Sequence, residues 1–289
     1  MTATTSTRPT PTRPSPTPAI PPGGLGRWLR RARWHLPAIA VFVATLALWE
    51  FVVGTIDIQG FPLPAPTEIG SALAENWDAG RWPIGKAVAA TLFEALGGLT
   101  IGTIAGVALA LLTARFVTAR ELLLPLAIGA SAVPIIAFAP LMNNWFGVLN
   151  PLSKMMIVAV LVFFPVVVNV TRGLTQVESA ALELMRSYAA TEWAVLRSVR
   201  VPNALPYFFT ALKVGTTLSL IGAIVGEYFG GANDVLGRVI VQSASALRFD
   251  VTWAAIVVGA VTGIALYLAI AALERVVIPW HASVRGGEP

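Results

Sequence analysis

Six long apolar stretches dominate the 289-residue sequence and constrain the fold more than any other feature. They run approximately over residues 36–55, 87–113, 121–140, 152–171, 207–227 and 251–273. About 20 apolar helical residues are needed to cross the roughly 30 Å hydrocarbon core of a bilayer, so each stretch is long enough for one crossing. The sequence therefore predicts an all-α membrane protein with six transmembrane helices.

The composition narrows the classes of function. The chain is 56% hydrophobic and 12% charged, which leaves too little polar surface for soluble domains. It has no cysteine and two histidines, so disulfides and thiol chemistry are excluded and a histidine-based metal or acid–base centre is not expected. The net charge of +5 lies in short basic flanks between apolar runs. That pattern is typical of a membrane surface, with lipid as a partner, and not of nucleic-acid binding.

The chain divides into three predicted segments. Residues 1–26 contain seven prolines among Thr, Ser and Gly, a composition that cannot bury a core, and are predicted to be a disordered cytoplasmic tail. The apolar stretch that follows is too long for a signal peptide and lacks a small-residue cleavage site. Residues 27–282 form the predicted six-helix domain, and residues 283–289 form a short cytoplasmic tail.

The distribution of Lys and Arg predicts the orientation in the membrane. With the N-terminus inside, fifteen of the 20 basic residues lie on the inner side, and the other five are Arg81, Lys86, Lys154, Arg238 and Arg248. Both termini and the polar loop 172–206, between the fourth and fifth spans, are therefore predicted to be cytoplasmic. Lys213 falls inside the fifth span near its cytoplasmic start, where its long stem is expected to extend to the lipid headgroups.

A stripe of small residues runs along the second predicted span. Gly98, Gly102 and Gly106 recur every four residues, so another helix can approach this stripe closely. Glu94 lies one turn outward on the same stripe. An ionised carboxylate would cost several kcal/mol in lipid, so Glu94 is expected to point into the bundle or an aqueous cavity, or else to reach interfacial water.

Four polar residues are candidates for lining a translocation path. Glu94 is the first of them. Asn143 and Asn144 combine amide groups with the aromatic side chains that follow, and Glu227 lies at the outer end of the fifth span. Each also fits a simpler role, as a helix anchor at the interface or as a turn element.

The loop 172–206 predicts two short helices on the cytoplasmic side. The first is amphipathic, with one face made of Val177, Ala181, Leu184, Met185 and Tyr188. Thr191 is the expected N-cap of a second helix, which carries Trp193 and ends before Pro202 and Pro206. A pair of helices lying on the headgroups is the alternative, but it does not explain a loop of this length with alternating acidic and basic residues.

The same loop contains a spaced motif. Glu183-Leu184-Met185 is followed by three residues, Ala189, nine residues and then Val199-Arg200-Val201-Pro202. This arrangement resembles the EAA loop of bacterial importer permeases of the ATP-binding cassette class, whose pattern is E-A-A, three residues, G, nine residues, I-x-L-P. Because Ala189 replaces the glycine, the turn either avoids a left-handed residue or strains an alanine.

The resemblance covers about residues 36–282, and segments 137–147 and 226–231 are similar to the subgroup that imports nitrate, sulfonates, taurine and pyrimidine precursors of thiamine. It implies a homodimer of permeases in the bacterial cytoplasmic (inner) membrane, two cytoplasmic ATP-binding subunits and an extracytoplasmic solute-binding protein. It also implies coupling to the ATPase through Glu183, Tyr188, Ala189, Trp193, Arg197 and Pro202. This chain has no Gly-x4-Gly-Lys-Ser/Thr phosphate loop. ATP and Mg²⁺ are therefore expected on the partner, and the chain itself is expected to have no cofactor and to be no enzyme.

The sequence leaves the solute open. The predicted spans hold no inward cluster of Arg or Lys for a fixed anion site, which favours a pyrimidine-type vitamin precursor over sulfonate, taurine or nitrate. A proton-coupled secondary transporter that uses Glu94 is a more remote alternative, because the chain shows no internal repeat. An integral membrane enzyme is weaker still, because clustered His or Cys and paired intramembrane carboxylates are not expected.

Overall fold

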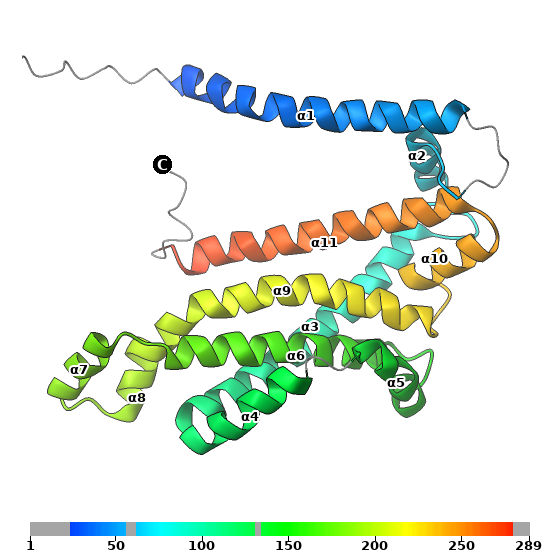
Figure 1. The fold of residues 1–289 in the computed structure, drawn as a ribbon. Helices are drawn as coiled ribbons and strands as arrows, with labels where there is room; N and C mark the ends of the chain where they lie inside the picture. Colours follow the sequence, from blue (N-terminus) through cyan, green and yellow to red (C-terminus); the bar gives the residue numbers. More distant parts are fainter. Residues whose placement is uncertain (1–23, 56–61, 131–133, 280–289) are drawn as a thin grey trace, which may run out of the picture. The chain divides into compact units, whose positions relative to one another are not determined.

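The computed structural model describes residues 24–55, 62–130 and 134–279, and every regular element in these ranges is a helix (Figure 1). Within these ranges, five helical segments are long and apolar enough to cross a membrane: Leu36–Thr55, Ile84–Arg115, Pro151–Thr175, Glu192–Tyr228 and Phe249–Val277. They contain five of the six predicted apolar stretches. The all-α membrane fold is confirmed, and the count of six crossings stays a prediction.

The chain forms two compact units that divide after Val52. The first contains most of helix α1 (Gly24–Thr55), which includes the first apolar stretch and begins inside the segment predicted to be a tail. Residues 1–23 of that tail and the predicted C-terminal tail 283–289 lie outside the described residues. The second unit begins with the end of α1 and holds every later helix, starting with the short α2 (Pro66–Glu75).

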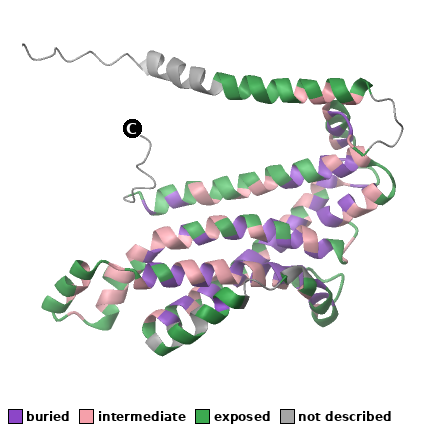
Figure 2. Cartoon of the chain, viewed as in Figure 1, coloured by how far each residue is buried: buried purple, intermediate pink, exposed green. Residues whose placement is uncertain are grey.

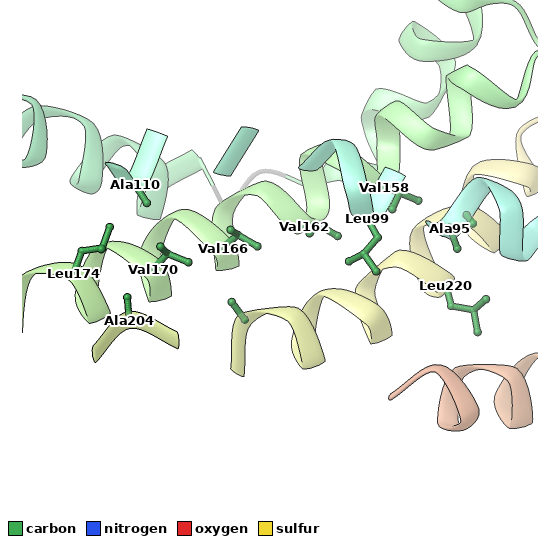
Figure 3. Close-up of a cluster of buried hydrophobic side chains, with 12 residues drawn as sticks. Ala95, Leu99, Ala110, Val158, Val162, Val166, Val170, Leu174, Ala204 and Leu220 are labelled. Carbon is green, nitrogen blue, oxygen red and sulfur yellow. The ribbon is translucent and has the colours of Figure 1, made fainter. Parts of the chain in front are cut away.

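Three helices form the core of the second unit: α3 (Ile84–Arg115), α6 (Pro151–Thr175) and α9 (Val201–Tyr228). The glycine stripe of α3 lies directly against α6, as the sequence predicts. A Cβ atom at Gly98 would lie 2.4 Å from the Cβ of Val158, and one at Gly102 would lie 2.5 Å from the carbonyl oxygen of Ala159. Buried valine, leucine and alanine side chains fill the space along these helices (Figure 3).

Helices α10 (Leu236–Ser245) and α11 (Phe249–Val277) pack beside α9. The hydroxyl groups of Ser243 and Thr252 lie 2.8 Å apart and join the two helices. Lys213 of α9 has a partner that the sequence did not indicate, and its extension to the headgroups stays a prediction. Its Nζ donates to Oε2 of Glu274 on α11 at 2.8 Å, because this carboxylate provides a partner within reach inside the bundle.

The third predicted span, 121–140, is wrong as a single continuous helix. The described residues form α4 (Val117–Ala130), a short 3₁₀ turn η1 (Ile135–Phe138) and α5 (Ala139–Phe146). Pro125 lies inside α4, while Pro134 and Pro140 flank the 3₁₀ turn. A proline lacks the N–H of the helical hydrogen bond and its ring crowds the preceding turn, so hydropathy overestimates the length of this helix.

The polar loop lies at one end of α6 and α9, opposite to α5 and α10 (Figure 1). It consists of α7 (Ser179–Ser187), α8 (Glu192–Val195) and a π-helical turn η2 (Leu196–Arg200). The helical segment does not end before Pro202 and Pro206 as predicted. It continues from Glu192 to Tyr228. Pro202 directly follows the π-helical turn, where the regular i→i−4 hydrogen bonding is already interrupted, and Pro206 lies inside α9.

Candidate functional site

Helices α7 and α8 present a polar and aromatic surface, and Figure 2 shows that their residues are exposed or half-buried. Tyr188 is 75% exposed and Trp193 is 69% exposed. Glu183 and Arg197 are also exposed, and Pro202 is half-buried at the start of α9. Large aromatic side chains with little cover are characteristic of protein–protein contact sites. Residues 176–200, called the coupling segment after their predicted role, thus form a protruding surface.

The turn between α7 and α8 has a defined geometry that depends on Ala189. The N–H of Ala190 donates to the carbonyl of Met185 at 3.0 Å, and the N–H of Ala189 donates to that of Arg186 at 2.9 Å. This pair of bonds is the Schellman motif, which requires a left-handed residue at the position of Ala189. The φ angle of Ala189 is +49°. Of the two alternatives that the sequence left open, the structure adopts the strained alanine.

Replacing Ala189 by glycine should stabilise the turn by about 1 kcal/mol, because glycine adopts positive φ without the Cβ clash. The measurement is thermal unfolding of the purified protein, together with hydrogen exchange at the amides of residues 188–190. Ala190→Gly is the matched control. Its φ is not positive, so the added backbone freedom should destabilise the protein slightly. Equal effects of the two substitutions would contradict the strained turn.

Two residues that the sequence did not single out as functional join the coupling segment to the bundle. The guanidinium Nη1 of Arg200 donates to the carbonyl of Ala114 on α3 at 3.2 Å. The side-chain amide of Asn203 donates to the carbonyls of Gly173 and Gln176, at 2.7 and 3.1 Å. These carbonyls belong to helix ends, where the last C=O groups lack helical partners. Arg200 therefore ties the coupling segment to α3, and Asn203 ties the start of α9 to the end of α6 and to Gln176, the first residue of the segment.

Two clefts adjoin these anchors. One, of about 280 Å³, lies between the C-terminal end of α3 and the side chains of Trp193, Leu196 and Arg200. The other, of about 290 Å³, lies between Arg115, Glu192 and Arg200 and the end of α6. This second cleft is polar. Because residues of α8 line both clefts, a shift of α8 would change the space beside α3.

The candidate path residues lie at the opposite end of the bundle. Glu94, Asn143 and Glu227 are buried, whereas Asn144 is exposed on α5. The amide of Asn143 donates to the carbonyl of Phe229 at 3.4 Å. Glu227 accepts a hydrogen bond from the N–H of Gly237 at 2.5 Å. The structure thus brings Asn143 to the end of α9 and Glu227 to the start of α10.

Glu94 and Glu227 also interact with each other, although paired intramembrane carboxylates were not expected. They come from spans that are far apart in the sequence, so periodicity within one helix does not reveal the pair. Lys154 of α6, which the sequence indicated only as one of the outer basic residues, interacts electrostatically with both and is 1% exposed. The sequence signal that was missed is the position of Lys154 inside the fourth apolar stretch, 152–171, where a charged side chain needs a partner.

The family model for the binding-protein-dependent transport system inner membrane component matches residues 98–280. This match covers more than half of the chain and includes α6, the coupling segment, α9 and α10. The chain belongs to this family. The permease is accordingly a multi-pass membrane protein and a transport subunit.

Three relatives extend the likeness of the permease beyond the matched residues. It is 29% identical over 260 residues to the riboflavin transport system permease protein RibX of Chloroflexus aurantiacus, covering 89% of this chain and 95% of that protein. It is 29% identical over 253 residues to the formylaminopyrimidine transport permease protein ThiX of Halalkalibacterium halodurans, covering 88% and 99%. It is 27% identical over 269 residues to the taurine transport system permease protein TauC of Escherichia coli, covering 89% and 96%.

Proposed function

We propose that this permease is the translocating subunit of an ATP-driven importer of a small nutrient, and that a cytoplasmic ATPase drives it through the coupling segment. The proposal includes two copies of the permease, two ATP-binding subunits that hold ATP and Mg²⁺, and an extracytoplasmic solute-binding protein. Family membership and the printed functions of the relatives support it. One structural observation carries the coupling role. The helix that carries the exposed Trp193 runs from Glu192 to Tyr228 and therefore continues into α9.

The mechanism follows from this continuity. Helix α9 packs along α6, the central helix of the core, and also contacts α3. A force applied at Trp193 therefore acts directly on this helix, and a force applied at Glu183 or Tyr188 reaches it through the hydrogen-bonded turn at Ala189. The π-helical turn at residues 196–200 lies where the segment joins α9, and such turns frequently mark functional sites. Closure of the ATPase dimer would then tilt the bundle between two arrangements.

Purification of the permease through an affinity tag tests the proposed partnership. The complex from native membranes should contain an ATP-binding subunit at a ratio of about one per permease chain, and it should hydrolyse ATP. The matched control is the same tagged chain with Trp193→Ala and Tyr188→Ala, which removes both exposed aromatic contacts and should lose the ATPase. Retention of the ATPase by this variant would contradict docking on the coupling segment.

The orientation gives a separate prediction, and the absence of native cysteine makes its test clean. Single cysteines at Ser71 and Asn233 should react with an impermeant thiol reagent in intact cells, whereas one at Ser198 should react only after the cells are opened. All three positions are exposed, so burial does not limit the reaction. The reverse pattern would contradict both the orientation and the cytoplasmic coupling segment.

We infer that the solute is a pyrimidine-like vitamin precursor, with sulfonate, taurine or nitrate as the alternative. The likeness to proteins named for formylaminopyrimidine and riboflavin transport supports the heterocycle, whereas the likeness to a taurine permease supports the alternative. Glu94, Asn143, Asn144 and Glu227 remain proposed path residues. Calorimetry on the cognate binding protein decides between the heterocycle and the alternative solutes. Micromolar affinity for taurine or nitrate, and none for a methylpyrimidine, would contradict the heterocycle.

A further inference from the structure

A cluster of buried charged side chains lies where α3, α6 and α9 meet the N-terminus of α10. Glu94 is 5% exposed, Lys154 1% and Glu227 0%. The cluster lies at the end of the bundle opposite to the coupling segment. Its carboxyl groups interact with each other and with the ammonium group of Lys154. Buried charge is costly unless it is paired, so the bonding of every atom matters.

The cluster first serves to hold α10. The N-terminal amides of a helix have no partner within the helix. In α10, the N–H of Leu236 donates to Oγ1 of Thr91 on α3 at 2.9 Å, and the N–H of Gly237 donates to Oε2 of Glu227 on α9. A Cβ at Gly237 would lie 2.5 Å from the carbonyl oxygen of Ile224, so α10 and α9 are in close contact. Glu227 is therefore a positioning residue for α10.

Two carboxylate oxygens of the cluster have no hydrogen-bond donor. Among the described residues, Oε2 of Glu94 and Oε1 of Glu227 are buried and have no hydrogen-bond partner. The Nζ of Lys154 donates to the carbonyl of Val148. Two ionised carboxylates facing each other would have two acceptors and no hydrogen between them. Buried polar atoms in folded proteins are nearly always paired, so one hydrogen is missing from this contact.

Charge accounting leads to the same result. Glu94, Glu227 and Asp234 carry acidic groups, and Lys154 acts on both buried glutamates. Arg238 follows Asp234 by four residues, at the start of α10, and Tyr228 adjoins Glu227. Asp234 is exposed and Arg238 is half-buried, so neither belongs to the fully buried set. Within that set, the carboxyl groups of Glu94 and Glu227 share the single ammonium group of Lys154. One further positive charge makes the buried cluster neutral.

We propose that one proton is bound between the carboxyl groups of Glu94 and Glu227 and completes, with Lys154, a neutral cluster that fixes α10 to the bundle. Glu94 carries this proton and donates it to Oε1 of Glu227. Glu227 stays ionised, is stabilised by the nearby positive charge of Lys154 and accepts from the N–H of Gly237. The proton is a fixed part of the fold, in contrast to a proton that moves with the solute.

Infrared spectroscopy of the purified permease at neutral pH tests the bound proton. The wild-type protein should show the C=O stretching band of a protonated carboxyl group, separate from the carboxylate bands. Glu94→Gln and Glu227→Gln should each lose this band, because the remaining glutamate then pairs with Lys154 as an ion. Glu183→Gln, at an exposed glutamate, is the control and should keep it. Absence of the band from the wild-type protein, or its persistence in both cluster variants, would overturn the proposal.

Hydrogen exchange separates the proton from mere packing. In Glu94→Gln the amide NH₂ replaces the proton as donor to Glu227, so exchange at residues 236 and 237 should stay within about twofold of wild type. Glu94→Leu has a similar volume but no donor, and should raise exchange there by about tenfold or more. Equal exchange in the two variants would contradict the role of the donated hydrogen. Neither experiment needs an ATPase or a solute, so failure here leaves the proposed import function untouched.

Discussion

Gly102→Ala should destabilise the permease by about 1–3 kcal/mol and reduce its yield in membranes. The added Cβ would lie 2.5 Å from the carbonyl oxygen and 3.0 Å from the Cα of Ala159. Both atoms belong to the backbone of α6, so no flexible side chain is available to move aside. The helices would have to separate along the contact that buries Val158, Val162 and Val166. Thermal unfolding in detergent, followed by loss of the monodisperse species, measures the effect.

The control for this prediction is Gly129→Ala in α4. A Cβ there would meet no atom within 4 Å. Alanine is also a better helix former than glycine by up to about 1 kcal/mol, so this variant should be as stable as wild type or more stable. The same chemical change therefore has opposite signs at the two positions. Equal stability of both variants would mean that α3 and α6 do not pack through the glycine stripe.

Glu183→Lys should uncouple ATP hydrolysis from transport without unfolding the protein. Glu183 is exposed on α7, so the substitution changes the charge of the coupling segment and leaves the buried core intact. A reversed charge at a docking contact typically costs about 2 kcal/mol or more, which corresponds to roughly thirtyfold weaker association. Solute-stimulated ATPase activity of the purified complex should fall accordingly, while its thermal unfolding stays at the wild-type value.

A matched variant distinguishes this effect from a general change of charge. Glu121→Lys makes the same substitution at an exposed position of α4, outside the coupling segment. It should leave solute-stimulated hydrolysis unchanged. Normal stimulation in Glu183→Lys, or an equal loss in Glu121→Lys, would refute the assignment of Glu183 to the coupling contact.

The features that were predictable from the sequence are those that one helix determines by itself. An apolar stretch of about 20 residues specifies a spanning helix, and five of these stretches lie in long helices of the structure. Gly98, Gly102 and Gly106 create a flat stripe that only a close neighbour can fill, and that neighbour is α6. The exposed α7 and α8 follow in the same way from a polar loop with a short amphipathic pattern.

Features that depend on local backbone hydrogen bonding or on contact between distant helices were not predictable. Hydropathy averages over Pro125 and Pro134, so it does not detect the break in the third span. Lys213 and Lys154 each find partners on helices remote in sequence, Glu274 on α11 and the two buried glutamates. The Schellman hydrogen bonds of the turn hold Ala189 at a positive φ, although alanine intrinsically disfavours this conformation.

Uptake into proteoliposomes tests the central claim most directly. The permease is reconstituted with its ATPase and the cognate binding protein, and radiolabelled methylpyrimidine, taurine and nitrate are offered outside. One arm has ATP inside the vesicles, a second has ATP with an ATPase that binds but does not hydrolyse it, and a third has a proton gradient without ATP. Uptake of one solute in the first arm alone is the predicted result. Equal uptake driven by the proton gradient without ATP would contradict an ATP-driven importer.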